Sequence, residues 1–492
     1  MPSLLFLSLF VAPNLTRVPD KIDNLRRGSS VMSLFRTKAI NADAYCDTGL
    51  RRCLSAFDLT MLGIGAIIGA GIFVLTGIAA ATQAGPGIVL SFVLAGFACA
   101  FAALAYAELA ACVGGCGSAY GYAYAGFGEF IAWLIGWDLI LEYGVATAAV
   151  AIGWSGYLNN ALTALGTPLP LELTRGPADG GLINLSAAAV ILVLAVLLAV
   201  GVHYSARFNA AMVLIKLTAI SVFIAVAFGH FDPANWEPFL PFGWQGVAGG
   251  AALIFFAYIG FDAVSTAAEE AVNPPRDVPI GIVASLAVCT AVYILVSGLL
   301  TGIVPYDTLN VASPVADSLL RLGHQWASAV IAAGAIAGLT TVMLVLFYAL
   351  TRVLLAMSRD GLLPPGIARI HPGTKTPART ILVGGVAMAA IAGFTPIGDV
   401  AELVNIGTLA AFVLVCGGVI VLRRTQPDLP RPFRSPWMPV APLLGIAFCL
   451  YLMASLPWVT WVRFGVWLAL GLLVYFLYSR HHSALAQSPG SA

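Results

Sequence analysis

The stretch that decides the fold is Leu62-Gly63-Ile64-Gly65-Ala66-Ile67-Ile68-Gly69-Ala70-Gly71-Ile72-Phe73, an apolar run with four glycines and no hydrogen-bonding side chain. Glycine inside a helix costs about 1 kcal/mol relative to alanine. Broken backbone at membrane depth is tolerated only where protein or a water-filled cavity covers it. The glycines therefore indicate either a broken helix that lines a site or a face where helices pack closely.

The composition of the whole chain is that of a polytopic membrane protein. Of its 492 residues, 60% are hydrophobic and only 10% are charged, whereas soluble domains carry about 25% charged residues. Short loops leave no room for a soluble catalytic domain, and the net charge of +1 implies no nucleic-acid partner. Windows of about 20 apolar residues predict twelve spans, which begin near Asp58, Gly87, Glu129, Ile183, Ala206, Trp244, Pro279, Gln325, Thr380, Asp399, Pro439 and Val459.

The distribution of basic residues predicts the orientation, because cytoplasmic loops are enriched in Lys and Arg. With the N-terminus inside, most of the 24 Lys and Arg residues are cytoplasmic, and only Arg175, Arg321 and Arg463 lie outside. Both termini are then cytoplasmic. The segment from Met1 to Val11 is too short to span a membrane and lacks a basic region before it, so we expect the polar, basic leader at Met32 to be the start.

A second interrupted segment lies in the other half of the chain. If the first ten spans form two inverted halves, the counterpart of the first span is the sixth, which reads Leu253-Ile-Phe-Phe-Ala-Tyr-Ile-Gly-Phe-Asp262. Interrupted helices at matching positions of inverted repeats indicate a transport site near the membrane midplane. The pair therefore favours the broken-helix interpretation of the first segment over simple packing.

Several motifs resemble one known superfamily. Ile64-Gly-Ala-Ile-Ile-Gly-Ala-Gly-Ile-Phe73 resembles the first helix of the amino acid–polyamine–organocation superfamily. Phe256 to Glu270 with Asn273 to Pro279, and Gly338 to Met343 with Met357 to Pro364, resemble its cationic amino acid transporter branch. The resemblance implies an all-α polytopic protein of the LeuT-like fold, with twelve transmembrane helices: a 5+5 inverted repeat followed by two C-terminal helices.

The resemblance also divides the chain and implies its surroundings. We expect a multi-pass protein of the plasma membrane (a bacterial inner membrane) with a small amino acid as substrate and no cofactor besides a coupling proton. The oligomeric state and a small accessory membrane subunit stay open. The expected parts are a leader over 1–57, a first repeat over 58–229, a second over 230–424, the last two helices over 425–480 and a cytoplasmic tail over 481–492.

An amino-acid zwitterion presents a carboxylate and an ammonium, and broken helices offer backbone groups for both. Free N–H groups at a half-helix start suit the carboxylate, and the resemblance implies that those around Ala70 and Gly71 take it. Carbonyl groups freed by the breaks would take the ammonium. By the same resemblance, these belong to Ile67, Phe256, Ala257 and Ile259.

Lys216 lies about ten residues into the fifth span, and a charged residue at that depth is a functional candidate by default. A structural ion pair or a lysine reaching to the interface is the alternative. The resemblance implies that its ammonium replaces the cation that sodium-coupled relatives hold between the first, fifth and eighth spans, so a proton would be the coupling ion. Glu142, four residues after Asp138, is the expected acidic partner, with a functional or a structural role.

Substrate selectivity is expected from Met343, Thr341 and Asn405, with Phe256. A bulky Met343 would favour small neutral amino acids, although core packing explains it equally well. Near the inner half or end of the sixth span, Asp262, Glu269 and Glu270 are expected either to act in a gate or to form cytoplasmic ion pairs with Arg276 and Arg352.

The leading prediction is thus a secondary active transporter that moves an amino acid by proton symport. The alternatives are a proton-independent exchanger or uniporter of cationic amino acids and a non-transporting sensor. No G-x-S-x-G, H-E-x-x-H or P-loop motif indicates an enzyme. No metal site is expected either, because Cys112 and Cys116 have no histidine near them.

Overall fold

The computed structural model describes residues 36–37, 54–113, 118–201, 206–372, 374 and 376–487. These residues form helices and their connections, with one isolated backbone bridge between Leu54 and Ala271. The predicted leader lies outside the described residues up to Cys53, apart from Arg36 and Thr37, and Met32 is among the residues left out. Cys116 and the last five residues of the predicted tail lie outside them as well.

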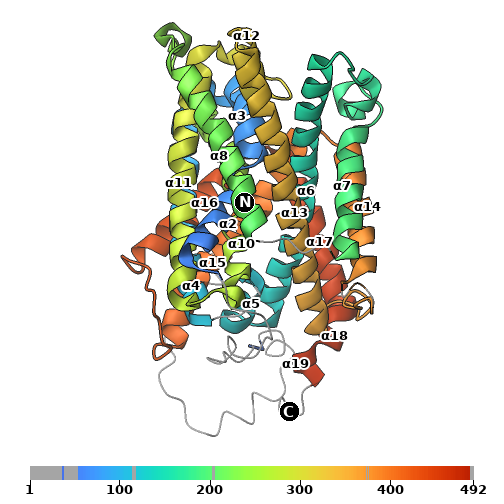
Figure 1. Ribbon diagram of the computed structural model, residues 1–492. Helices are drawn as coiled ribbons and strands as arrows, with labels where there is room; N and C mark the ends of the chain where they lie inside the picture. The colour runs from blue at the N-terminus through green and yellow to red at the C-terminus, as the bar shows by residue number, and fades with distance from the viewer. Residues whose placement is uncertain are drawn as a thin grey trace, which may run out of the picture.

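The helices form an upright bundle (Figure 1). Eight helical segments of the described residues are long and apolar enough to cross a membrane, and four shorter apolar helices accompany them. The long segments contain α4 (Ile88–Val113), α6 (Glu129–Ala164), α8 (Ala206–Phe228), α9 (Gly243–Ile254), α11 (Pro274–Ile303), α13 (Gln325–Arg359), α15 (Ile397–Thr425) and α17 (Trp458–Val474). The shorter ones are α2 (Ala56–Ile67), α7 (Leu185–Val200), α14 (Ala378–Phe394) and α16 (Val440–Ala454).

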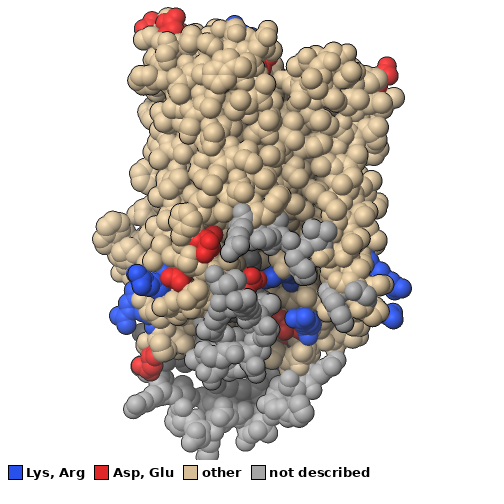
Figure 2. Space-filling model, in the orientation of Figure 1, with Lys and Arg blue, Asp and Glu red and all other residues tan. Residues whose placement is uncertain are grey.

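Short helices cap the two ends of the bundle. One end carries α12 (Pro314–Arg321), and the other carries α5 (Ser118–Gly126), α18 (Arg480–His482) and α19 (Ala484–Gln487) (Figure 1). Most Lys and Arg side chains visible in Figure 2 lie in a band towards the end with α18 and α19. This is the end that the sequence predicts to be cytoplasmic. The orientation, the number of spans and the repeat remain predictions.

The first predicted break is present in the chain. The helix α2 starts with a capping box, in which Ser55 and Asp58 bond each other's backbone N–H, and it ends at Ile67. Ile68 is extended, with φ −72° and ψ 99°. The helix resumes as a π-helical turn, η4 (Gly71–Leu75), and continues as α3 (Thr76–Ala79).

A second break follows α9. A 3₁₀ turn, η10 (Phe255–Tyr258), leads to the extended Ile259 and to Gly260, whose φ of +120° is open mainly to glycine. The chain then returns to a short helix, α10 (Ala263–Thr266). The two interrupted helices are the two that the sequence singles out.

Glycine brings the two breaks into backbone contact. A Cβ at Gly71 would lie 2.2 Å from the Cα of Ala257, and a Cβ at Gly260 would lie 2.9 Å from the carbonyl carbon of Ala66. No side chain fits between the segments at either point. Both interpretations of the segment Leu62–Phe73 therefore hold. Its glycines lie in a broken helix, and they also allow two helices to pack in backbone contact.

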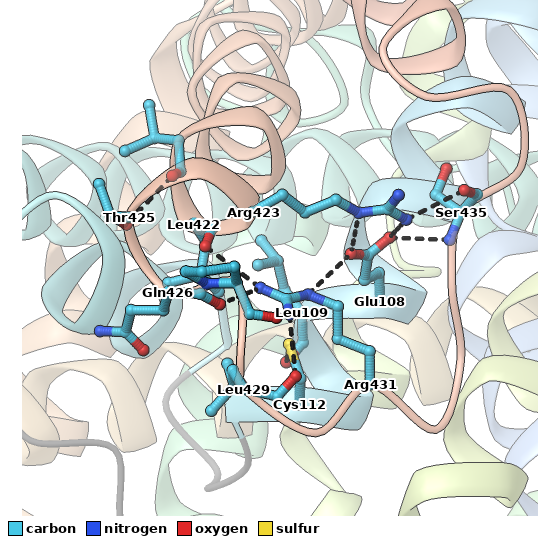
Figure 3. A network of polar contacts seen from close by, with 12 residues as sticks. Glu108, Leu109, Cys112, Leu422, Arg423, Thr425, Gln426, Leu429, Arg431 and Ser435 are labelled. Atoms are coloured by element: carbon cyan, nitrogen blue, oxygen red, sulfur yellow. Dashed lines mark hydrogen bonds and ion pairs between the residues drawn. The ribbon is translucent and has the colours of Figure 1, made fainter.

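A buried carboxylate joins three segments at the end that is rich in basic residues (Figure 3). Glu108 of α4 accepts hydrogen bonds from Arg423 of α15 at 2.6 and 2.7 Å and from the N–H of Ser435 at 2.8 Å. Arg431 lies 3.6 Å from the same carboxylate and donates to carbonyl groups at and beyond the end of α15, including those of Leu422 and Gln426. The network holds the end of α15 and the α15–α16 connection, through Arg431 and Ser435, against α4.

The backbone contact between the two breaks predicts that one methyl group added at Gly71 destabilises the protein. Gly71→Ala should lower the free energy of unfolding by about 1–3 kcal/mol, because overpacking against backbone forces the segments apart. Gly465→Ala in α17, where nothing lies within 4 Å of an added Cβ, is the matched control and should be neutral or stabilising by about 0.5–1 kcal/mol. Thermal unfolding in detergent measures both, and equal melting temperatures for the two variants would contradict the contact.

Candidate functional site

A narrow cavity lies between the two breaks, with about 10 Å³ open to the centre of a water-sized molecule. Its walls come from α2 and η4, from η10 and Ile259, and from α6 and α13. Five of the six predicted substrate-binding residues line it: Ile67, Ala70, Gly71, Phe256 and Ile259. The sixth, Ala257, touches Gly71 beside the cavity. The remaining lining residues are Ala66, Gly69, Ala146, Val150, Val342 and Leu346.

Two carbonyl groups at the breaks share the hydroxyl group of one tyrosine. The hydroxyl oxygen of Tyr293, in α11, lies 2.9 Å from the carbonyl oxygens of both Ile67 and Ala257. A hydroxyl carries one hydrogen, so it cannot fully satisfy both carbonyl groups at once. The carbonyl of Phe256 accepts from the N–H of Ile259 at 3.3 Å. The site thus holds under-satisfied acceptors where the sequence predicts an ammonium.

Tyr293 is absent from the residues singled out in the sequence. It is fully buried and packs edge-on against Tyr258. The only sequence feature that points to Tyr293 is a tyrosine in the middle of an apolar span. That signal is weak, because Tyr258 is equally buried and donates instead to the carbonyl of Phe92.

Lys216 lies beside the first break. Its ammonium donates to the carbonyl oxygens of Gly65 at 2.7 Å and Ile68 at 3.0 Å, and none of the ion pairs found among the described residues includes it. The carbonyl end of a helix is the negative end of its dipole, so the cation satisfies the end of α2. The side chain crosses α13 at Gly338, where a Cβ would lie 2.8 Å from the Cγ of Lys216.

Glu142 is not paired with Lys216. It belongs with Asp138 of the same helix and Asp262 after the second break, which interact with it electrostatically. Tyr143 donates to Asp262 at 2.6 Å. One oxygen of each of these three carboxyl groups is buried without a hydrogen-bond partner. The acids therefore form a separate group on the α6 side of the site.

The three residues predicted to set selectivity do not line the cavity. Met343 is fully buried in α13, and Thr341 donates to the carbonyl of Gly338 in its own helix. The Asn405 amide donates to the carbonyl oxygens of Ala252 at 2.7 Å and Leu253 at 2.9 Å. Asn405 thus satisfies the end of α9, much as Lys216 satisfies that of α2.

Val342 and Leu346 face the cavity from α13 instead, and Ala146 and Val150 face it from α6. Each pair is spaced by four residues and so shares one helix face. The sequence did not reveal these faces, because both helices are apolar on most sides. One predicted ion pair is confirmed, since Arg352 lies 3.3 Å from Glu270. The side chain of Glu269 lies outside the described residues.

Comparison with known proteins decides the family. The chain matches the amino acid permease family over residues 54–476. It belongs to this family. It is 50% identical over 457 residues to the methylthioribose transporter of Bacillus subtilis, with 92% of this chain and 99% of that protein covered. It is 51% identical over 463 residues, with the same coverage, to the branched-chain amino acid permease BcaP of the same organism.

More distant members of the family are also similar. The human cationic amino acid transporter 4 is 39% identical over 400 residues, which cover 79% of this chain and 63% of that protein. The permease-family match, together with the apolar helices, makes the chain a multi-pass transport protein of the plasma membrane and not an enzyme. The superfamily suggested by the sequence motifs is confirmed.

The contacts of Lys216 predict a stability effect. In Lys216→Met the aliphatic stem remains but the carbonyl groups of Gly65 and Ile68 lose their donor, which should cost about 1–3 kcal/mol for each buried acceptor left unsatisfied. Ser221→Ala, one turn further along α8, removes only an exposed hydroxyl that bonds within its own helix and should leave stability unchanged. Thermal unfolding compares the two variants. A Lys216→Met protein as stable as the wild type would mean that the ammonium is not needed at the break.

Proposed function

We propose that the chain is a secondary active transporter that takes up a neutral amino acid with an apolar side chain, driven by proton symport. The observation that carries the proposal is the cavity between two broken helices, which combines bare backbone with apolar walls. The comparisons support transport by an amino acid permease, and the geometry adds the chemistry of the substrate.

The backbone side of the cavity suits the part that all amino acids share. The N–H groups at Ala70 and Gly71 stand where the helix resumes, and first-turn N–H groups lack partners within the helix. We assign the substrate carboxylate to them. The carbonyl groups of Ile67 and Ala257, shared by one hydroxyl, are assigned to the ammonium.

The other side of the cavity suits an aliphatic side chain. Ala146, Val150, Val342 and Leu346 present only hydrocarbon, and no charged residue is among the lining residues. An unpaired lysine or arginine side chain would be costly there. This supports a substrate like that named for the branched-chain permease over one like that named for the cationic transporter.

A second candidate substrate is methylthioribose, which names a relative of equal similarity. Its thioether end would suit the same apolar walls, and its hydroxyl groups could bond the free backbone. It lacks the opposite charges that fit a cradle with N–H groups on one side and carbonyl groups on the other, so we rank it second.

The proposed topology has twelve spans with both termini cytoplasmic. We propose that 58–229 and 230–424 are two inverted repeats, and that 425–480 adds the last two helices. The support is the matching position of the breaks after α2 and within the α9 segment, together with eight long and four shorter apolar helices among the described residues.

We further propose that Lys216 couples transport to protons. Its ammonium joins α8 to the carbonyl end of α2 beside the cavity, so loss of its proton would weaken the hold on the broken helix. Glu142 belongs to a neighbouring group of acids and is proposed as a second proton carrier. We also propose that Met343, Thr341 and Asn405 act indirectly, by positioning the helices that bear the lining residues.

Uptake by purified protein in liposomes tests the substrate. Radiolabelled leucine should be taken up, and competition should be strong with valine and isoleucine, weak with arginine and absent with methylthioribose. Leu346→Ala should increase competition by phenylalanine relative to valine, because it enlarges the apolar wall. Val330→Ala, at an exposed position of the same helix, is the matched control and should leave the order unchanged. Strong arginine or methylthioribose competition would overturn the assignment, and binding without flux would indicate a sensor.

An imposed pH gradient tests the coupling. Wild-type liposomes with an alkaline interior should accumulate substrate, and a protonophore should abolish the accumulation. Lys216→Met should lose this response while it retains exchange of internal for external substrate, measured on protein shown to be folded. Uptake by the wild type that ignores the gradient would identify an exchanger or uniporter instead. A full gradient response in Lys216→Met would remove Lys216 from the coupling mechanism.

A further inference from the structure

Two histidines lie together at the end of the bundle opposite the basic band. His230 follows α8, and His324 precedes α13, two helices that run side by side (Figure 1). Their Nε2 atoms are 3.3 Å apart, and their rings meet at 75° with centroids 4.8 Å apart. His230 is exposed and His324 is half-buried, so both are within reach of solvent.

The hydrogen bond of His230 determines which of its nitrogens is free. Its Nδ1 lies 2.9 Å from the carbonyl oxygen of Val226. A carbonyl only accepts, so Nδ1 carries the hydrogen, and the Nε2 of the neutral ring presents a lone pair. Histidines that ligate metals usually make this second hydrogen bond, because it fixes both the ring and its tautomer.

The distance between the two nitrogens fits a shared metal ion. With Zn–N bonds of about 2.0–2.1 Å, two ligands of a tetrahedral ion are separated by about 3.3–3.4 Å. The observed 3.3 Å equals this separation.

We propose that His230 and His324 form a two-histidine site for a divalent transition-metal ion such as Zn²⁺ or Cu²⁺. Imidazole nitrogen suits these ions, whereas Mg²⁺ and Ca²⁺ prefer oxygen ligands. Within the described part of the chain no group of three or more His, Cys, Asp or Glu residues could hold a metal, so water completes the coordination. The bound ion bridges the end of α8 to the start of α13.

The bridge connects helices that meet again at the candidate site. Further along the bundle, Lys216 of α8 crosses Gly338 of α13. A ligand that binds only the folded protein stabilises it in proportion to its occupancy. Metal binding at the histidine pair therefore raises the thermal stability of the whole bundle.

Metal binding to the full-length protein tests the site, with a purification tag that contains no histidine. One equivalent of Cu²⁺ should give an electron paramagnetic resonance spectrum with two imidazole nitrogens, and Zn²⁺ should raise the melting temperature. His230→Ala and His324→Ala should each abolish the two-nitrogen spectrum and weaken metal affinity by at least about tenfold. His371→Ala and the double variant His481→Ala/His482→Ala are matched controls and should behave as the wild type.

Each outcome decides the proposal. Loss of the two-nitrogen spectrum in both single variants, together with loss of the Zn²⁺ effect on melting, supports the site. A spectrum that survives in either variant, or that disappears in a control, assigns the metal to other residues and overturns it. A wild-type protein without metal-dependent stabilisation overturns it as well. His324→Cys, which retains a zinc ligand at the same position, should preserve Zn²⁺ stabilisation and excludes simple misfolding as the cause.

Discussion

The structure depends on one constraint, which is that backbone carbonyl groups exposed by a broken helix must find donors where water is scarce. Three side chains from three other helices meet this demand. Lys216 of α8 bonds the carbonyls of Gly65 and Ile68, Tyr293 of α11 those of Ile67 and Ala257, and Asn405 of α15 those of Ala252 and Leu253. The two breaks therefore explain why these three polar side chains lie deep in the bundle.

The same breaks shape the cavity. Because Gly71 touches Ala257 and Gly260 touches Ala66, the two interrupted segments are held at backbone distance, and the space beside them is lined by main chain on one side. Packed helices, α6 and α13, supply hydrocarbon on the other. In the proposed function, this division separates recognition of the groups common to all amino acids from recognition of the side chain. It is consistent with a family whose members carry the names of different substrates.

Two groups of buried acidic residues differ in how well their oxygens are hydrogen-bonded. The carboxylate of Glu108 is matched by Arg423 and by the N–H of Ser435 at the end of the bundle (Figure 3). Asp138, Glu142 and Asp262 each keep one buried oxygen without a partner, which is costly unless the group holds a proton or changes its surroundings. Glu108, with its partners Arg423 and Ser435, holds three segments together. The second group contains Glu142, the proposed second proton carrier.

The sequence by itself determined the class, the two broken segments and the depth of Lys216, because glycine clusters and isolated charges are conspicuous in an apolar chain. The family resemblance adds the backbone residues of the candidate site, and five of the six predicted ones line the cavity. The side-chain part does not follow. Met343 and Val342 differ by one residue and point to different neighbours, and in a helix that is apolar on most sides nothing in the sequence indicates which one faces the cavity. Tyr293, the separation of Glu142 from Lys216 and the meeting of His230 with His324 were decided only by tertiary packing, because each depends on the rotation and approach of helices far apart in the chain.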